Sequence, residues 1–591
     1  MKKNIIHASL SFFILCGINY YFFPMADKLV PDYGVNVSGT NSIFNIVLFL
    51  AIWYGIKKAP KIARRAKAFI FSIAGFLAIS QSIGNILVKK NNLTLWGLEH
   101  LTFAFMLIGL FFLFNYILVY LFHWLDNYKQ KEKKEKIWWF FTDNAKSFWL
   151  VFLAFAICYL PYIITYWKGI GGHDLRISII PQIESGNYSA HHPLIYTLFI
   201  KIFYDIGEKF NFYFVPVFEW VQILLCCLTF SYLIYFLAQI KILKWQRIVI
   251  FLFLLLNPFL HIFAPAPTKD VMFTWACILL FIEIYKLASD STIYLAKKMN
   301  IKIILVAFFF VISRNNGWHS FLISAPFLIF VFRKHWLKMT TIILSVIILA
   351  QAVNYLQFDV FKVGKSRDGE SYSPILQQMR KVYLVHEDDL SQEEIEALGA
   401  IFKLEDRRYS DTINDFSKRV DIFNGAIFKS NSSEYIKLWA NLGYRFPLTY
   451  IAAFLNTNLP LWYLDSPVPR YSHDGGGYFH IEPINGNRSG FPFVNIAKTY
   501  SKINKNIEAS NIPLVSNLTS FTVSIMAMLL VMLLLIYRKS KIWVVMLPLA
   551  VYWFTNLFGP VAFARYLMPY VILALPSVAI LLDEFKKGGS N

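Results

Sequence analysis

The stretch 101-LTFAFMLIGLFFLFNYILVYL-121 carries no charged side chain over 21 residues. A helix of about 20 apolar residues is long enough to cross the hydrocarbon core of a bilayer. Positive charge returns only beyond this stretch, in the lysine-rich segment 129–136. The stretch therefore predicts a transmembrane helix, and the lysines that follow it indicate a cytoplasmic loop.

Composition extends this prediction to the whole chain. Hydrophobic residues make up 57% of the 591 residues, charged residues make up 16%, and the mean hydropathy is +0.49. Soluble domains usually have 45–50% apolar and about 25% charged residues. Because a soluble protein of this size could not bury so much apolar surface, the sequence predicts an all-α polytopic membrane protein.

The net charge of +21 comes from 57 basic and 36 acidic residues. In a soluble protein this excess would indicate nucleic-acid binding. Here the basic residues gather in short loops between apolar runs, which is typical of bacterial plasma-membrane proteins. The lipid bilayer is therefore an expected partner and nucleic acid is not. The five cysteines lie in apolar runs and indicate no disulfide framework or thiolate metal site: Cys16, Cys158, Cys226, Cys227 and Cys277.

The positive charges also predict the direction of each span. Two lysines precede the first apolar run, which indicates an uncleaved first helix with a cytoplasmic N-terminus. Six basic residues and no acid between positions 57 and 67 mark the next cytoplasmic loop. Following the runs onward predicts about 12–14 helices. The first long extracytoplasmic loop is then 168–193, and the C-terminus lies in the cytoplasm.

Residues 358–445 differ from the rest of the chain because they hold 15 of the 36 acidic residues. Ser391 followed by Glu394 matches a capping box, the pattern that starts a helix. The sequence therefore predicts a small helical module on the extracytoplasmic side.

The apolar run 450–463 does not fit the alternation of spans. If it crossed the membrane, the basic residues at 538–541 would lie outside, against the positive-inside rule. We therefore expect it to be re-entrant or interfacial. The predicted domains are a four-helix transmembrane extension (1–146), a transmembrane core (147–357), the extracytoplasmic module (358–445), the re-entrant segment with an outer Gly/Pro-rich loop (446–515) and the C-terminal helices (516–591).

A group of ionisable side chains is predicted at the extracytoplasmic ends of separate apolar helices. Charged groups near the membrane core are energetically costly, so they are candidates for a functional role. Agreement among several loops on one face predicts a common site. The candidates are His173, Asp174, His191, His192, Lys269, Asp270, Arg314 and Arg565.

Asp174 follows a glycine pair, which permits a sharp turn or a close approach to a ligand. A carboxylate at this position could act as a general base toward a hydroxyl group, and the alternative is an ordinary solvated loop aspartate. A second outer aspartate, Asp474, also follows a histidine and is a competing candidate for the base.

The remaining candidates suit an anionic ligand. Lys269, Arg314 and Arg565 could bind a phosphate or pyrophosphate at headgroup depth; alternatively, Lys269 pairs with Asp270 and the arginines extend to lipid headgroups. His191 and His192 open a helix and could bind phosphate, donate a hydrogen bond or ligate metal. Their spacing supports no defined metal site, so no metal ligand is assigned, while a divalent cation stays open as a cofactor.

At these positions the chain resembles bacterial GT-C-type membrane glycosyltransferases, with distant similarity to the protein mannosyltransferase and aminoarabinose transferase families. The resemblance spans roughly residues 147–582. The segments 172-GHD-174, 192-HP-193 and 565-RYLMP-569 carry it. The segments 268-TKD-270, 314-RNNG-317 and 377-QQMRKVY-383 look more like an uncharacterised bacterial subfamily of this class. The chain departs from the family pattern in its four additional N-terminal helices and in Gly-His-Asp where some relatives have an Asp-Glu pair.

The resemblance implies a GT-C-like transmembrane bundle and an inverting transfer of a sugar from a polyprenyl-phosphate donor on the extracytoplasmic face. Asp174 would be the general base, and Lys269, Arg314 and Arg565 would stabilise the phosphate leaving group. His173, His191, His192 and Asp270 would help to bind donor or acceptor. The implied acceptor is a cell-envelope glycan, such as a wall polysaccharide or teichoic acid.

Two other function classes stay open. A polysaccharide polymerase or ligase would use the same lipid carrier but transfer a whole glycan. A transporter or flippase for a lipid-linked sugar would need polar groups within the membrane, and Glu219 and Glu283 lie in or near apolar runs.

Overall fold

The structure is a computed structural model of the 591-residue chain. It describes residues 2–22, 43–128, 141–165, 169–172, 174–296, 299–365, 369, 372–414, 416–466, 482–483 and 520–588. The candidate site residue His173 and the competing base Asp474 lie outside these residues.

The chain is an all-α membrane protein, as the composition predicts. Six segments of the described residues are long and apolar enough to cross a membrane. They are α3 (Arg64–Lys90), α4 (Glu99–Asp126), α8 (Phe214–Gln239), α11 (Lys269–Ser289), the segment Arg333–Val360 that contains α15 (Trp336–Tyr355), and α26 (Ala564–Gly588). Shorter apolar helices accompany them, namely α5 (Ala145–Thr165), α13 (Met299–Ser313) and α24 (Phe521–Tyr537).

The chain divides into two compact units. The first contains residues 1–131, 374–467 and 585–591, and the second contains residues 132–373 and 468–584. Every candidate site residue in the described part of the chain belongs to the second unit.

Close backbone contact joins two helices of the first unit. α1 (Lys2–Phe22) packs against α4, and α2 (Ile43–Lys58) packs against α1. A Cβ atom on Gly17 would lie 2.7 Å from the Cα of Gly109. The crossing of α1 and α4 therefore requires glycine, as in many helix pairs within membranes.

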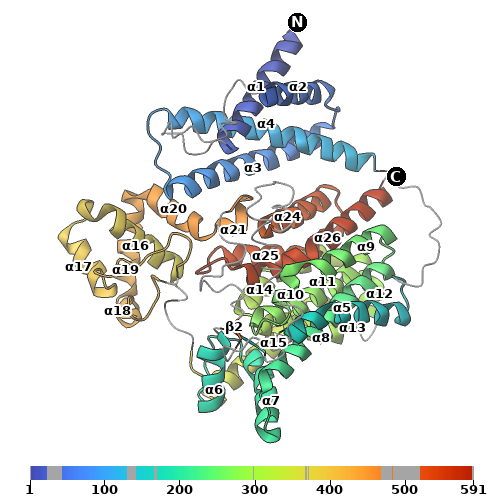
Figure 1. Cartoon of the computed structure of the whole chain (residues 1–591), viewed down its shortest axis with the longest axis vertical. Coiled ribbons are helices and arrows are strands. Elements are labelled where there is room, and N and C mark those ends of the chain that lie inside the picture. The colour runs from blue at the N-terminus through green and yellow to red at the C-terminus, as the bar shows by residue number, and fades with distance from the viewer. Residues whose placement is uncertain are drawn as a thin grey trace. The chain divides into compact units, whose positions relative to one another are not determined.

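The acidic region of the first unit is helical, as predicted. It contains α16 (Ser373–His386), α17 (Gln392–Ile401), α18 (Gly425–Ser430) and α19 (Ser432–Arg445), drawn in yellow and light orange in Figure 1. The predicted capping box is confirmed: the hydroxyl of Ser391 accepts from the Glu394 amide at 3.2 Å, and the Glu394 carboxylate accepts from the Ser391 amide at 3.0 Å.

The apolar run 450–463 forms two short helices, α20 (Pro447–Thr457) and α21 (Leu459–Trp462). Neither is long enough to cross a bilayer alone. Within the first unit, α20 lies beside one end of α3, where Asn456 donates a hydrogen bond to the Asn91 carbonyl at 3.2 Å. The re-entrant or interfacial character of this run stays a prediction.

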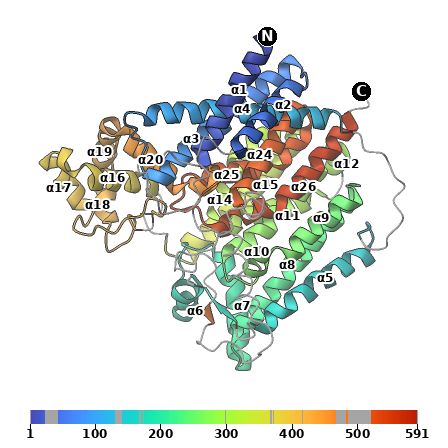
Figure 2. The same cartoon turned by 45° about the horizontal axis from the view of Figure 1, so that its top comes forward.

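α11 is the most enclosed of the six long apolar segments, with 89% of its apolar window buried. It packs against α8, α13 and the 3₁₀ turn at Lys541–Val545, and both views show it among the helices of the second unit (Figure 1 and Figure 2). The packing of these elements around α11 therefore holds the N-terminal residues of α11 in position.

One apolar run of the second unit is interrupted. The apolar run 248–263 forms α9 (Lys244–Leu256) and α10 (Pro258–Phe263). Pro258 lacks the backbone N–H that a continuous helix needs, and Asn257 caps the new helix by accepting from the Phe259 amide at 3.0 Å.

The segment 168–193, expected as a loop, contains regular structure. Ile170–Gly171 (β1) pairs antiparallel with Glu482–Pro483 (β2). A π-helical turn, η1 (Leu175–Ile179), and α6 (Ile180–Ser185) follow Asp174 directly. π-helical turns occur often at functional sites. The position of Asp174 next to such a turn therefore supports it as a candidate functional residue.

Candidate functional site

Six of the sequence-predicted residues lie together in the second unit. Asp174 stands at the start of η1, and His192 lies two residues before α7 (Leu194–Phe210). Three others begin helices: Lys269 opens α11, Arg314 directly precedes α14 (Asn315–Val331), and Arg565 is the second residue of α26. The sequence thus brings the N-termini of four helices to one cluster, which also contains Asp270.

Arg565 joins the two aspartates of this cluster. Its Nη1 donates to Oδ2 of Asp174 at 2.9 Å, and its Nε lies 3.3 Å from Oδ2 of Asp270. The side chain of Asp270 is 1% exposed, while those of Asp174 and Arg565 are 19% and 16% exposed. Asp174 is therefore the more accessible of the two carboxylates.

Arg314 neutralises Asp270 from the opposite side. Its guanidinium forms an ion pair with Oδ1 of Asp270 and lies 4.0 Å from the ring centroid of Tyr566. The rings of Tyr552 and Phe273 lie within about 6 Å of the same guanidinium. Held by a carboxylate and three aromatic rings, Arg314 is a fixed cation of the cluster.

Lys269 connects the two histidines to the cluster. Its Nζ donates to the backbone carbonyl of His191 at 3.3 Å and to Nδ1 of His192 at 3.4 Å. The two imidazole rings meet edge to face, with their centroids 4.7 Å apart. The sequence left open whether Asp270 pairs with its neighbour Lys269, and in the structure the carboxylate forms ion pairs with two arginines from other helices.

Tight packing positions Asp174 relative to α11. A Cβ atom on Gly172 would lie 2.9 Å from Cγ of Pro267, so the chain before Asp174 touches the chain before α11. The hydroxyl of Thr268 caps α11 and donates to Oδ2 of Asp270 at 2.9 Å. From α8, Gln222 donates to the carbonyls of Ala264 and Ala266, both at 2.8 Å. These contacts fix the loop that carries Lys269 and Asp270.

A second set of contacts holds the segment that leads to the histidines. The Ser189 amide donates to Oε1 of Gln182 at 2.8 Å, and the Ala190 amide donates to the Gly364 carbonyl at 2.7 Å. Gly364 follows a second π-helical turn, η3 (Leu356–Val360). The residues before His191 are thus bonded to two separate parts of the second unit.

The charges around Asp174 and His192 determine their ionisation. Burial alone would raise the pKa of Asp174, but the nearby charges of Arg565 and Lys269 hold that pKa below its usual value. Burial and the charge of Lys269 lower the pKa of His192 to about 3. At neutral pH, Asp174 is therefore a carboxylate and His192 is a neutral imidazole.

The cluster as a whole favours an anion. Its side chains are two carboxylates, two guanidinium groups and one ammonium group, so one positive charge is in excess at neutral pH. The four helix N-termini add positive potential, because each carries backbone N–H groups and the positive end of a helix dipole. Among the described residues, no group of three or more His, Cys, Asp or Glu side chains is arranged to hold a metal ion.

Sequence reasoning did not predict the roles of three further residues of this region. Thr268, Gln222 and Tyr566 act through a cap, two backbone contacts and an aromatic face. Thr268 and Tyr566 lie in the segments 268-TKD-270 and 565-RYLMP-569, and a threonine before Lys-Asp also matches a helix N-cap. Gln222 looks like an ordinary residue of an apolar helix.

A family model matches residues 178–587, which is more than half of the chain. The chain belongs to DUF6020, a family of unknown function. The matched segment of this DUF6020 chain contains His191, His192, Lys269, Asp270, Arg314 and Arg565, and it begins four residues after Asp174. The comparison with curated proteins and the comparison with solved structures found no match.

Proposed function

We propose that this chain is a GT-C-type membrane glycosyltransferase that moves a sugar from a polyprenyl-phosphate donor to a cell-envelope glycan on the extracytoplasmic face. The observation that carries the proposal is the ion pair between Asp174 and Arg565 beside the N-termini of α7, α11 and α14. It combines a partly exposed carboxylate with a cation-rich group of backbone and side-chain donors. A reaction that needs a base next to an anion-binding group would use both.

In the proposed reaction, a hydroxyl oxygen of the acceptor attacks the anomeric carbon of the donor sugar. The bond between that carbon and the phosphate oxygen breaks, and the proton of the hydroxyl passes to the Asp174 carboxylate. The products are a new glycosidic bond and polyprenyl phosphate. A single displacement of this kind inverts the anomeric configuration.

Arg565 and Lys269 would hold the phosphate, where negative charge grows as the bond breaks. Arg314 is occupied by Asp270 and by the ring of Tyr566, so its role would be to keep Asp270 neutralised and α14 in place.

The pairing of Asp174 with Arg565 also suggests how the base becomes active. While Arg565 binds Asp174, the carboxylate is a weak base because its pKa is low. A donor phosphate competes for the same guanidinium. When the phosphate takes Arg565, the pKa of Asp174 rises toward the range that suits proton transfer.

The test uses purified protein in nanodiscs with a panel of polyprenyl-phosphate sugars and crude envelope glycan as acceptor. Release of polyprenyl phosphate is compared between the wild type, Asp174→Asn and Asp205→Asn. Asp205 is a suitable control because it is an exposed acid on α7 that pairs with Lys201. We expect release by the wild type and Asp205→Asn and a loss of at least 100-fold in Asp174→Asn.

Wild-type turnover in Asp174→Asn would exclude Asp174 as the base. If the wild type releases no lipid phosphate from any donor in the presence of envelope glycan, the proposed transfer itself is wrong. If a whole glycan rather than one sugar is transferred, the product on a gel will show it and the polymerase or ligase class will apply.

A further inference from the structure

The start of α7 contains buried polar atoms that the proposed mechanism does not use. Tyr196 is 0% exposed, and within the part of the chain that the structure describes its hydroxyl has no hydrogen-bond partner. The same holds for Nε2 of His192, a residue that is 3% exposed. A buried polar atom without a partner destabilises the folded state, so two of them near the start of one helix need an explanation.

The hydrogen-bonding character of His192 follows from its contact with Lys269. An ammonium group can only donate, so Nδ1 of His192, 3.4 Å from Nζ of Lys269, is the acceptor. Because the imidazole is neutral, its single hydrogen is then on Nε2. His192 therefore presents an N–H donor that has no acceptor among the described residues.

Both side chains lie beside residues of the proposed site. Nδ1 of His192 lies 3.4 Å from Nζ of Lys269, which directly precedes Asp270, and Asp270 shares Arg565 with Asp174. The Tyr196 amide donates to the Pro193 carbonyl at 2.9 Å, so Tyr196 lies in the first turn after His192. A tyrosine hydroxyl can donate and accept a hydrogen bond at once. Together with the Nε2–H group of His192, it offers two donors and one acceptor next to a carboxylate.

We propose that Tyr196 and His192 bind hydroxyl groups of the donor sugar beside Asp174, and that Tyr196 is a specificity-determining residue of the site. This inference takes the identity of the donor from the proposed function. A sugar ring carries several hydroxyl groups that each donate and accept, which matches the uncharged donors and acceptor at the start of α7. Phosphate would instead be held by the cations Lys269 and Arg565. A site built to hydrogen-bond a hydroxyl group discriminates strongly against ligands that lack it.

The test is the substitution Tyr196→Phe, which removes only the hydroxyl. Thermal unfolding is measured first. Because the hydroxyl has no protein partner within the described part of the chain, we expect a midpoint equal to or higher than that of the wild type.

Binding of a polyprenyl-phosphate sugar that the wild type prefers is then compared with binding of bare polyprenyl phosphate. We expect at least tenfold weaker binding of the sugar-carrying lipid and unchanged binding of the bare lipid.

Tyr204→Phe is the matched control, since Tyr204 lies on the same helix two turns farther along and undergoes the same chemical change. We expect it to leave the binding of both lipids unchanged. A lower unfolding midpoint in Tyr196→Phe would show that the hydroxyl has a partner within the protein, and this would overturn the inference. Equal binding of the sugar-carrying lipid by Tyr196→Phe and the wild type would also overturn it.

These outcomes are separate from those for the transfer reaction. Suppose the sugar-carrying lipid binds in a Tyr196-dependent manner while no polyprenyl phosphate is released with envelope glycan present. That result would support the sugar site and contradict the proposed transfer reaction. If the wild type binds no sugar-carrying lipid more tightly than the bare lipid, the sugar site is wrong, whatever the release assay gives.

Discussion

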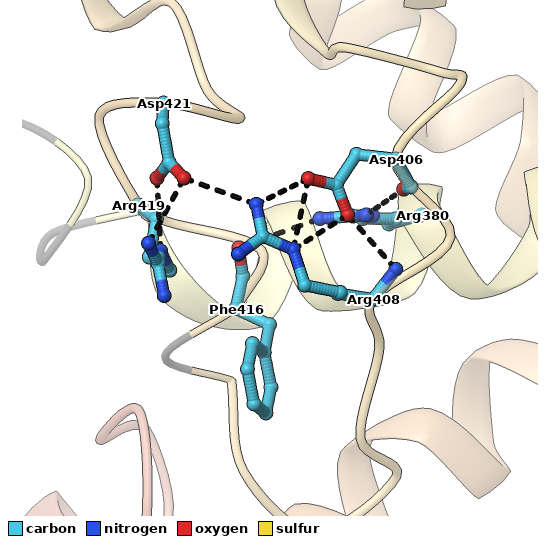
Figure 3. Close-up of polar contacts among 6 residues, drawn as sticks. All are labelled: Arg380, Asp406, Arg408, Phe416, Arg419 and Asp421. Atoms are coloured by element: carbon cyan, nitrogen blue, oxygen red, sulfur yellow. Dashed lines mark hydrogen bonds and ion pairs between the residues drawn. The ribbon is translucent and has the colours of Figure 1, made fainter.

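Among the described residues, each of the two units contains an aspartate–arginine–aspartate group. In the second unit, Arg565 joins Asp174 and Asp270. In the helical module of the first unit, Arg408 joins Asp406 and Asp421, as Figure 3 shows. Its Nε lies 2.9 Å from Oδ1 of Asp406, and its Nη2 lies 3.0 Å from Oδ2 of Asp421.

The two groups have the same chemistry but different surroundings. The side chain of Arg408 is 49% exposed, and Asp421 has a further partner in Arg419 (Figure 3). Arg565 is 16% exposed and reaches an aspartate that is 1% exposed. Charges exposed to water interact weakly, whereas buried charges must be paired. We therefore assign a local stabilising role to the Arg408 group, whereas the Arg565 group belongs to the proposed site.

The largest expected difference comes from removing each arginine. Arg565→Ala leaves Asp174 and Asp270 with fewer counter-charges, and breaking a buried pair costs about 3–5 kcal/mol. We expect a clear fall in the unfolding midpoint of the nanodisc-embedded protein and a loss of at least 100-fold in release of polyprenyl phosphate.

Arg408→Ala is the control for that change, because an ion pair exposed to water contributes little to stability. We expect turnover within twofold of the wild type and a small shift of the midpoint. Similar losses in both variants would show that burial does not distinguish the two groups.

A smaller effect is expected from Gly172→Ala. The added methyl group would lie 2.9 Å from Cγ of Pro267, which moves the chain before Asp174 away from the chain before α11. A misplaced catalytic group costs much of the rate, so we expect about a tenfold fall in turnover with intact folding. Gly55→Ala is the control, since a methyl group added there would have no other atom within 4 Å. Full activity in Gly172→Ala would show that this close approach does not position the base.

The smallest predicted effect near neutral pH concerns the titration of His192. The pKa of His192 is lowered to about 3 in the folded protein, whereas an unfolded histidine titrates near pH 6.5. Between these values the unfolded chain binds the extra proton, so stability falls as the pH decreases from about 6.5 toward 3. We expect His192→Gln to flatten this part of the stability profile, measured as the unfolding midpoint against pH. An unchanged slope would mean that His192 is not the group that titrates there.

Hydropathy alone predicted most of the helices, because an apolar run of sufficient length has few alternatives to a membrane helix. It also pointed to Asp174, Lys269, Asp270, Arg314 and Arg565, because charge at the end of an apolar run is costly and stands out. These signals are local, so each can be recognised within a short window of sequence.

The partners of these residues could not be predicted in the same way. Nothing near Asp174 indicates that its counter-charge is Arg565, and nothing near Asp270 indicates that two arginines would surround it. Tyr196 looks like any aromatic residue of an apolar helix, and only its burial without a partner among the described residues distinguishes it. The turns at 175–185 were missed because a polar segment with glycine and proline is typical of a loop.

The separation of Asp174 and Arg565 along the chain has a consequence for biosynthesis. The two residues are 391 positions apart, which corresponds to roughly 20–80 s of translation at 5–20 residues per second. During that interval Asp174 and Asp270 are present while Arg565 has not yet been made. We expect the second unit to reach its protease-resistant form only after α26 has entered the membrane. Ribosome-bound chains stopped before and after residue 565, compared by limited proteolysis, would measure this delay.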